Sequence, residues 1–73
     1  MRNIQEELLR QITNCLGEND SRVKEINILI ENKKIRNAYV IIRKLRDDNL
    51  IYGDKIDELI ERYWWDYANW DEI

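Results

Sequence analysis

An all-α fold, a compact bundle of three to four short helices, is predicted by three observations on this sequence. Apolar residues recur three and four positions apart along most of the chain, which is the spacing of one helix face. No segment alternates in the manner of a strand, and no proline interrupts the 73 residues. The two glycines, Gly17 and Gly53, punctuate the helical pattern. A chain of this length forms one helical domain, residues 1–73.

The first helix is expected from Asn3 to Leu16. Its apolar face combines residues three and four apart: Ile4, Leu8, Leu9, Ile12, Cys15 and Leu16. Gly17 suits the residue with positive φ that often follows a helix. Because Cys15 falls on the apolar face and has no base beside it in sequence, we expect a buried structural thiol and not a nucleophile.

The second helix is expected to begin at a cap provided by Asp20 or Ser21. Its buried face consists of Val23, Ile26 and Ile30, with Leu29 as a further candidate. The polar run 32–34 favours a break, because the apolar stripe shifts there by roughly a quarter turn at ~100° per residue. One continuous helix over residues 21–47 is the alternative. After a break, the third helix (35–47) is apolar on nearly every side and is the expected central element.

The fourth helix is expected from an N-cap at Asp54 to about Trp70, because acidic residues follow Asp54 in the first turn. Its apolar stripe has heptad-like spacing: Ile56, Leu59, Ile60, Tyr63, Tyr67 and Trp70. The connector before it contains three apolar side chains, Leu50, Ile51 and Tyr52, which are expected to pack inward.

A chain this short has a small core, which self-association would supplement. Three apolar residues lie outside the expected helix faces and could form the seam of a homodimer: Ile28, Val40 and Ile41.

Cys15 is the only cysteine, so no disulfide forms within the chain, and without histidine no metal site or cofactor is expected. The lone cysteine, the absence of an apolar leader and the short apolar runs predict a soluble, cytoplasmic protein with no membrane partner.

The net charge of −3 conceals an asymmetry along the chain. Residues 22–46 contain eight basic and two acidic side chains, a balance of +6. Residues 54–73 contain two basic and seven acidic side chains, a balance of −5. The two segments could attract each other within one chain or between two chains, or they could be two separate solvated faces.

The acidic C-terminal stretch also contains all three tryptophans. On a helical wheel Trp64 lies at the edge of the apolar stripe, whereas Trp65 falls ~180° from Ile56 on a polar face. Trp65 therefore either packs on another segment or is an anchor for a partner. Tryptophan is among the residues most enriched at binding hot spots, whereas small domains also commonly bury it, so both interpretations stay open.

We therefore expect a non-enzymatic inhibitor or adaptor that docks on a larger protein through an acidic, Trp- and Tyr-rich C-terminal helix. The expected partner-binding residues are Trp65, Trp64, Glu61, Asp66 and Glu72. Carboxylates around an indole favour a basic partner, including one with a nucleic-acid-binding surface. By analogy from size and composition alone, phages and mobile elements encode such proteins, among them anti-defence inhibitors and antitoxins.

The alternative function is a dimeric nucleic-acid-binding regulator that uses the basic segment 33–46. Its phosphate contacts would come from four side chains: Arg36, Arg43, Lys44 and Arg46. The acidic chain as a whole, with no glycine-containing turn of a helix-turn-helix, counts against direct nucleic-acid binding. A structural subunit that folds only within a larger assembly is a third interpretation. Catalysis is not expected, because no histidine and no glycine-rich phosphate loop is present.

Overall fold

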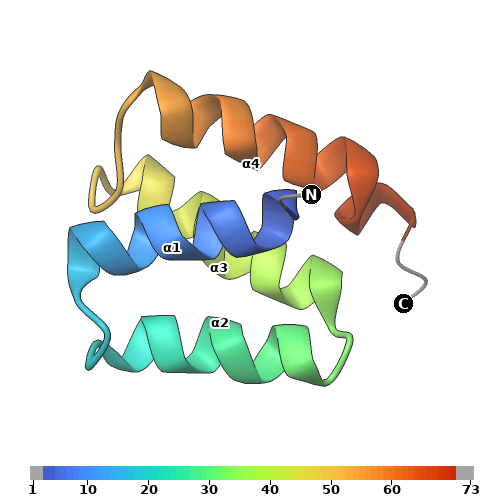
Figure 1. The fold of residues 1–73 in the computed structure, drawn as a ribbon, viewed down its shortest axis with the longest axis horizontal. Helices are drawn as coiled ribbons and strands as arrows, with labels where there is room; N and C mark the ends of the chain where they lie inside the picture. Colours follow the sequence, from blue (N-terminus) through green and yellow to red (C-terminus); the bar gives the residue numbers. More distant parts are fainter. Residues whose placement is uncertain (1–2, 71–73) are drawn as a thin grey trace.

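Four α-helices and one short 3₁₀ helix make up the structure. A computed structural model describes residues 3–70, with Trp70 described by its backbone only. The elements are α1 (Ile4–Leu16), α2 (Ser21–Glu31), α3 (Ile35–Asp47), α4 (Asp54–Asp66) and the 3₁₀ helix η1 (Ala68–Trp70) (Figure 1). Residues 3–70 contain no strand, so the prediction of an all-α bundle is confirmed.

The four α-helices pack as a closed ring of neighbours (Figure 1). Both α1 and α3 contact α2 and α4, whereas α1 and α3 do not approach each other through their backbones. The short η1 packs on α3 and α4. Because α4 touches as many elements as α3 does, the expectation that α3 is the central element is wrong. Val40 on α3 is 61% exposed, so one side of this helix faces solvent.

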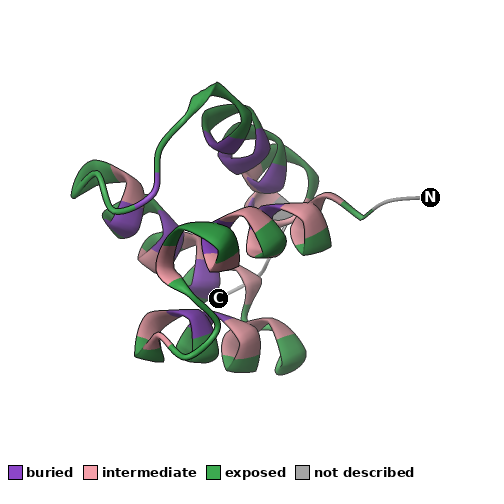
Figure 2. Ribbon diagram, turned by 60° about the vertical axis from the view of Figure 1, so that its left-hand side comes forward, coloured by how far each residue is buried: buried purple, intermediate pink, exposed green. Residues whose placement is uncertain are grey.

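The core is formed by the inward faces of all four α-helices, together with one connector residue and one residue of η1 (Figure 2). Its buried residues are Leu8, Ile12, Val23, Ile26, Ala38, Ile42, Leu45, Ile51, Ile56, Leu59, Ile60, Tyr63 and Ala68. Among the described residues, no polar or charged residue other than Tyr63 with its hydroxyl is part of this core. The apolar spacing in the sequence therefore identified the inward face of each helix.

Local hydrogen bonds set the beginnings of α1 and α2. Asn3 Oδ1 accepts a hydrogen bond from the backbone N–H of Gln5 at 2.8 Å, and Asp20 Oδ1 accepts one from the N–H of Arg22 at 2.8 Å. The sequence offered Asp20 or Ser21 as the cap of α2, and Asp20 is the residue that caps it. Gly17 has the expected positive φ, 92°, which residues with a Cβ rarely adopt.

The predicted break between the second and third helices is confirmed. Lys33 adopts a left-handed conformation with φ 60°, although it is not a glycine. The N–H of Lys33 donates to the carbonyl of Ile30 at 3.0 Å, and the N–H of Lys34 donates to the carbonyl of Leu29 at 2.8 Å. This pair of bonds is the Schellman arrangement, which satisfies carbonyls that the end of a helix leaves without partners.

The fourth helix is shorter than the sequence predicted. It begins at Asp54, which is a first-turn residue and not the N-cap, because Gly53 occupies the cap position with φ 117° and no side chain caps the helix. At the other end Tyr67, with φ −131° and ψ −66°, leaves helical geometry after Asp66. The predicted continuation to Trp70 is therefore wrong, and that segment is η1.

Three side chains that were expected inside the protein lie at its surface. Leu50 and Tyr52 are exposed, so of these three connector residues only Ile51 is buried in the core. Cys15 is exposed as well. The fully buried part of α1 ends at Ile12, and Cys15 in the last turn lies beyond it.

Replacing Ile51 with alanine should lower the free energy of unfolding by about 2–4 kcal/mol, because the change deletes a buried side chain and leaves a cavity. Urea unfolding followed by circular dichroism measures the loss. Tyr52→Ala is the matched control, since Tyr52 is the next residue and is 68% exposed. It should change the free energy of unfolding by less than ~0.5 kcal/mol. Equal losses in the two variants would contradict this packing of the connector.

The stability of the protein should fall as pH drops from about 4 to about 2. Hydrogen bonds from the Arg22 side chain lower the pKa of Asp20 from 3.8 to about 2. A carboxyl group with a lowered pKa in the folded state adds stability that is present above its ordinary pKa and is lost as pH falls through the lowered value. Asp20→Asn keeps an oxygen that can cap α2 but has no charge to titrate. Its thermal melting point should therefore depend less steeply on pH than that of the wild type, and identical pH profiles would refute this assignment.

Candidate partner-binding surface

Three consecutive aromatic residues near the end of α4 point in three directions. Successive residues of an α-helix are turned by ~100° about its axis. Tyr63 is completely buried, Trp64 is half-buried and Trp65 is 59% exposed. Once Tyr63 enters the core, the directions of both tryptophans follow from helix geometry.

Tyr63 connects α4 to α3. Its hydroxyl donates a hydrogen bond to the backbone carbonyl of Ile35 at 3.1 Å, and its ring lies parallel to that of Tyr39 with centroids 6.2 Å apart. Tyr67 packs against Tyr63 with centroids 5.7 Å apart, and its own hydroxyl donates to Asn3 Oδ1 at 2.8 Å. The end of α4 is therefore held against both α3 and the start of α1.

Trp64 faces the space between α3 and α4 and does not share the direction of Trp65. Its ring packs on Tyr39 with centroids 5.0 Å apart. The guanidinium of Arg36 lies 5.5 Å from the centroid of the Trp64 ring, within the range of a cation–π contact. The two adjacent tryptophans, both predicted to bind a partner, thus belong to different surfaces.

The outward face of α4 contains the exposed indole of Trp65 and several acidic side chains. Glu61 lies one turn before Trp65, Glu58 lies two turns before it, and Asp66 follows it, all three exposed. Arg62 on this face forms an ion pair with Glu58 at 4.0 Å. We call Glu58, Glu61, Trp65 and Asp66 the acidic indole face. The remaining predicted contact, Glu72, lies outside the described residues.

Arg36, a predicted phosphate-binding residue, holds the C-terminal segment onto α3. Its Nε donates to the backbone carbonyl of Ala68 at 3.1 Å, and its terminal nitrogen donates to the carbonyl of Asn69 at 3.3 Å. Together with the contact to Trp64, these bonds connect α3 to residues 28 to 33 positions later in the chain. This role had no local signal in the sequence.

The other three predicted phosphate-binding residues have different surroundings from Arg36. Arg46 is paired with Asp57 of α4, and its hydrogen bonds hold the pKa of Asp57 below its usual range. Arg43 approaches Asp47 at 3.8 Å, and Lys44 is exposed.

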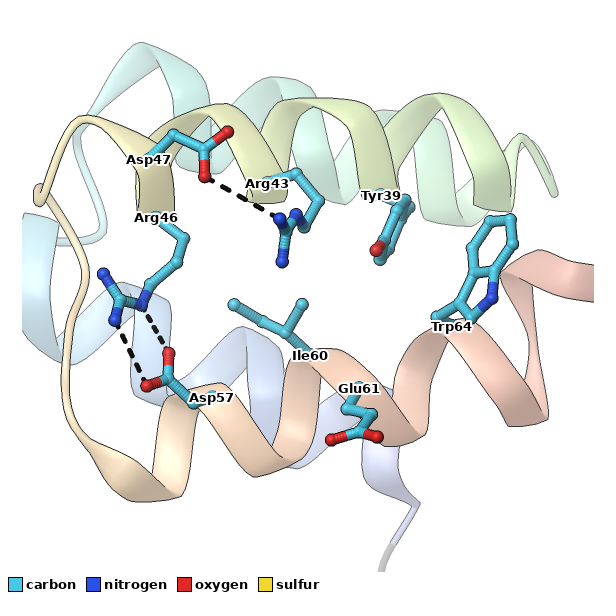
Figure 3. Close-up of a pocket in the computed structure, with 8 residues that line it drawn as sticks. All are labelled: Tyr39, Arg43, Arg46, Asp47, Asp57, Ile60, Glu61 and Trp64. Atoms are coloured by element: carbon cyan, nitrogen blue, oxygen red, sulfur yellow. Dashed lines mark hydrogen bonds and ion pairs between the residues drawn. The ribbon is translucent and has the colours of Figure 1, made fainter.

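A groove with a volume of about 580 Å³ runs between α3 and α4 (Figure 3). Tyr39 and Trp64 form one end of it, and the ion pair of Arg46 and Asp57 forms the other. Ile60 lies at its floor (Figure 3). Sequence reasoning missed this groove, although Tyr39 shares a side of α3 with Arg43 and Arg46, a spacing that could have indicated it.

A metal-binding cluster and a membrane-spanning helix are both absent from the described residues. Within residues 3–70, no group of three or more His, Cys, Asp or Glu side chains could hold a metal ion. None of the helices in that range combines the length and the apolar character needed to cross a membrane.

Comparisons of the chain with protein-family models, characterised proteins and solved structures find no match. The function must therefore be inferred from the surface itself.

Arg36→Ala should lower the free energy of unfolding by about 1–2 kcal/mol, because two backbone carbonyls lose a charged donor and Trp64 loses its cation contact. Urea unfolding measures the loss, and amide hydrogen exchange should show faster opening around Ala68. Lys44→Ala removes an exposed charge from the same helix and should leave both observables unchanged. A similar result for the two variants would contradict the role of Arg36.

Proposed function

We propose that this protein is a non-enzymatic protein-binding module, a cytoplasmic inhibitor or adaptor that docks on a larger protein through the acidic indole face. The observation that supports this function is the 59% exposure of Trp65 at the outer side of α4. An indole in this position contributes little to the core of its own chain, but it can contribute a few kcal/mol when a partner buries it.

The chemistry of the face favours a basic partner. Among the described residues, the acidic indole face contains three exposed carboxylates, and the one arginine beside them, Arg62, is paired with Glu58. A local excess of negative charge steers a positively charged surface into contact and speeds association. Proteins that bind nucleic acids have such surfaces, so an inhibitor of this kind would occupy the surface in place of the nucleic acid.

The contribution of each predicted contact differs. Trp65 is the proposed anchor, and Glu61 and Asp66 are the proposed flanking contacts. Trp64 acts indirectly in this proposal, because its packing on Tyr39 helps to hold α4 in the rotation that presents Trp65.

The nucleic-acid alternative has less support from the described residues. Phosphate binding needs several cations that can reach one backbone at once. Arg36 and Arg46 are half-buried and bind carbonyl or carboxylate oxygens of this chain. Arg43, which approaches Asp47 at 3.8 Å, and Lys44 are exposed and are the more accessible pair. Under that alternative, charge reversal of Arg43 and Lys44 would abolish binding and replacement of Trp65 would not.

Trp65→Ala should change the free energy of unfolding by less than ~0.5 kcal/mol. The same change should weaken the complex with the partner by roughly 30-fold or more, because a buried anchor is lost. The partner is first captured from the host with the tagged wild type and identified, and purified variants are then titrated against it by calorimetry. Tyr52→Ala is the control, since Tyr52 is an exposed aromatic residue outside the acidic indole face. Unchanged affinity of Trp65→Ala, or loss of its fold, would refute the proposal.

A further inference from the structure

The face of the molecule that contains the groove has one basic and one acidic edge (Figure 3). Arg43 extends over Ile60 from the α3 side, and Glu61 projects from the α4 side. Both are exposed. The ion pair of Arg43 is with Asp47 at 3.8 Å, and among the described residues Glu61 forms no ion pair. The two opposite charges of this face are thus not paired with each other within one chain.

Arg43 and Glu61 lie at the same height along their helices. Arg46 pairs with Asp57 on one side of them, and Tyr39 packs on Trp64 on the other side, so α3 and α4 run antiparallel in this register. One turn from Arg43 lies Val40, and one turn from Glu61 lies Trp65. Helix geometry turns Val40 away from α4 and turns Trp65 away from α3. Val40 is 61% exposed and Trp65 is 59% exposed.

We propose that this α3–α4 face binds a second copy of the same chain in a two-fold symmetric dimer. A two-fold axis parallel to the helices places α3 of one copy opposite α4 of the other. In such an isologous interface every contact occurs twice. Arg43 of each copy then meets Glu61 of the other, and Val40 of each copy packs on Trp65 of the other.

Charge and size both favour a second copy as the occupant. The basic edge and the acidic edge are presented side by side by one chain, so two identical faces are complementary after a two-fold rotation. The molecule measures 28 × 27 × 24 Å, so an interface over one whole side of it is of the order of the ~800 Å² per partner that a stable interface buries. The groove between the edges has an apolar floor, which side chains of the second copy would cover.

This dimer uses different residues from the seam that the sequence suggested. Val40 remains part of it, whereas Ile28 belongs to α2, which does not border the groove, and Ile41 packs against the core. The dimer also covers part of the acidic indole face. Self-association and docking on the larger partner would then compete, but the dimer contacts involve residues of this chain alone.

Reversing one charge at a time tests the proposal. The wild type should sediment at twice the 9.0 kDa mass of one chain, with a dissociation that is measurable on dilution. Arg43→Glu and Glu61→Arg should each place like charges opposite each other twice per dimer, and each should weaken self-association at least ~10-fold. Circular dichroism of both variants should remain that of the folded wild type, because both residues are exposed.

Mixing the two variants is the decisive measurement. In the mixed dimer, both charge contacts again join opposite signs, so an equimolar mixture should regain the dimer mass that neither variant shows alone. Lys24→Glu and Glu25→Arg reverse exposed charges on α2, which does not border the groove, and should leave the wild-type dimer unchanged. Val40→Asp, at an exposed position, should also weaken the dimer.

A wild type that stays monomeric at millimolar concentration would overturn the proposal, as would a mixture of the two variants that remains monomeric. Failure of these tests would leave the capture experiment with Trp65→Ala unaffected, because that experiment compares binding to a different molecule. Success in the mixing experiment combined with failure of capture would show a dimer and refute the proposed docking.

Discussion

The burial of Tyr63 is the constraint on which the other features of this protein depend. Its ring lies between Tyr39 and Tyr67, and its hydroxyl satisfies the carbonyl of Ile35 at the first residue of α3. Successive helical residues are each turned by ~100° from the last, so the rotation of α4 that buries Tyr63 also fixes the directions of the two residues after it. With Tyr63 inside, Trp64 must border α3 and Trp65 must face outward. The exposed indole is thus a consequence of how the core is built.

The distribution of charge follows from the same arrangement. The core contains no ionised group among the described residues, so the described charges of the basic segment 22–46 and of the acidic segment that begins at residue 54 lie outside the core. One part of the imbalance is neutralised between α3 and α4, where Arg46 binds Asp57. Another part of the basic segment binds the carbonyl of Ala68 through Arg36. What remains is an acidic outer side of α4 beside a basic edge of α3, and both proposed interactions rest on these two surfaces.

Local patterns predicted most of the fold, and long-range contacts account for what they missed. Apolar spacing and the cap at Asp20 identified the helices and the break after α2, because these features depend on neighbours within one or two turns. The end of α4 at Tyr67 was missed, since neither glycine nor proline marks it. The roles of Arg36 and Trp64 were missed for a related reason. Each contacts residues from another helix, and helical periodicity contains no information about which helices become neighbours. The direction of Trp65 needed only the helical wheel.

The central claim is that Trp65 faces water while Trp64 is sheltered by α3. Acrylamide quenching of two single-tryptophan variants tests it most directly: one variant retains only Trp65 and the other retains only Trp64, with the remaining tryptophans replaced by phenylalanine. The dilute monomer should show a quenching constant several-fold larger for Trp65 than for Trp64. Equal constants, or stronger quenching of Trp64, would contradict the rotation of α4 and with it the proposed surface.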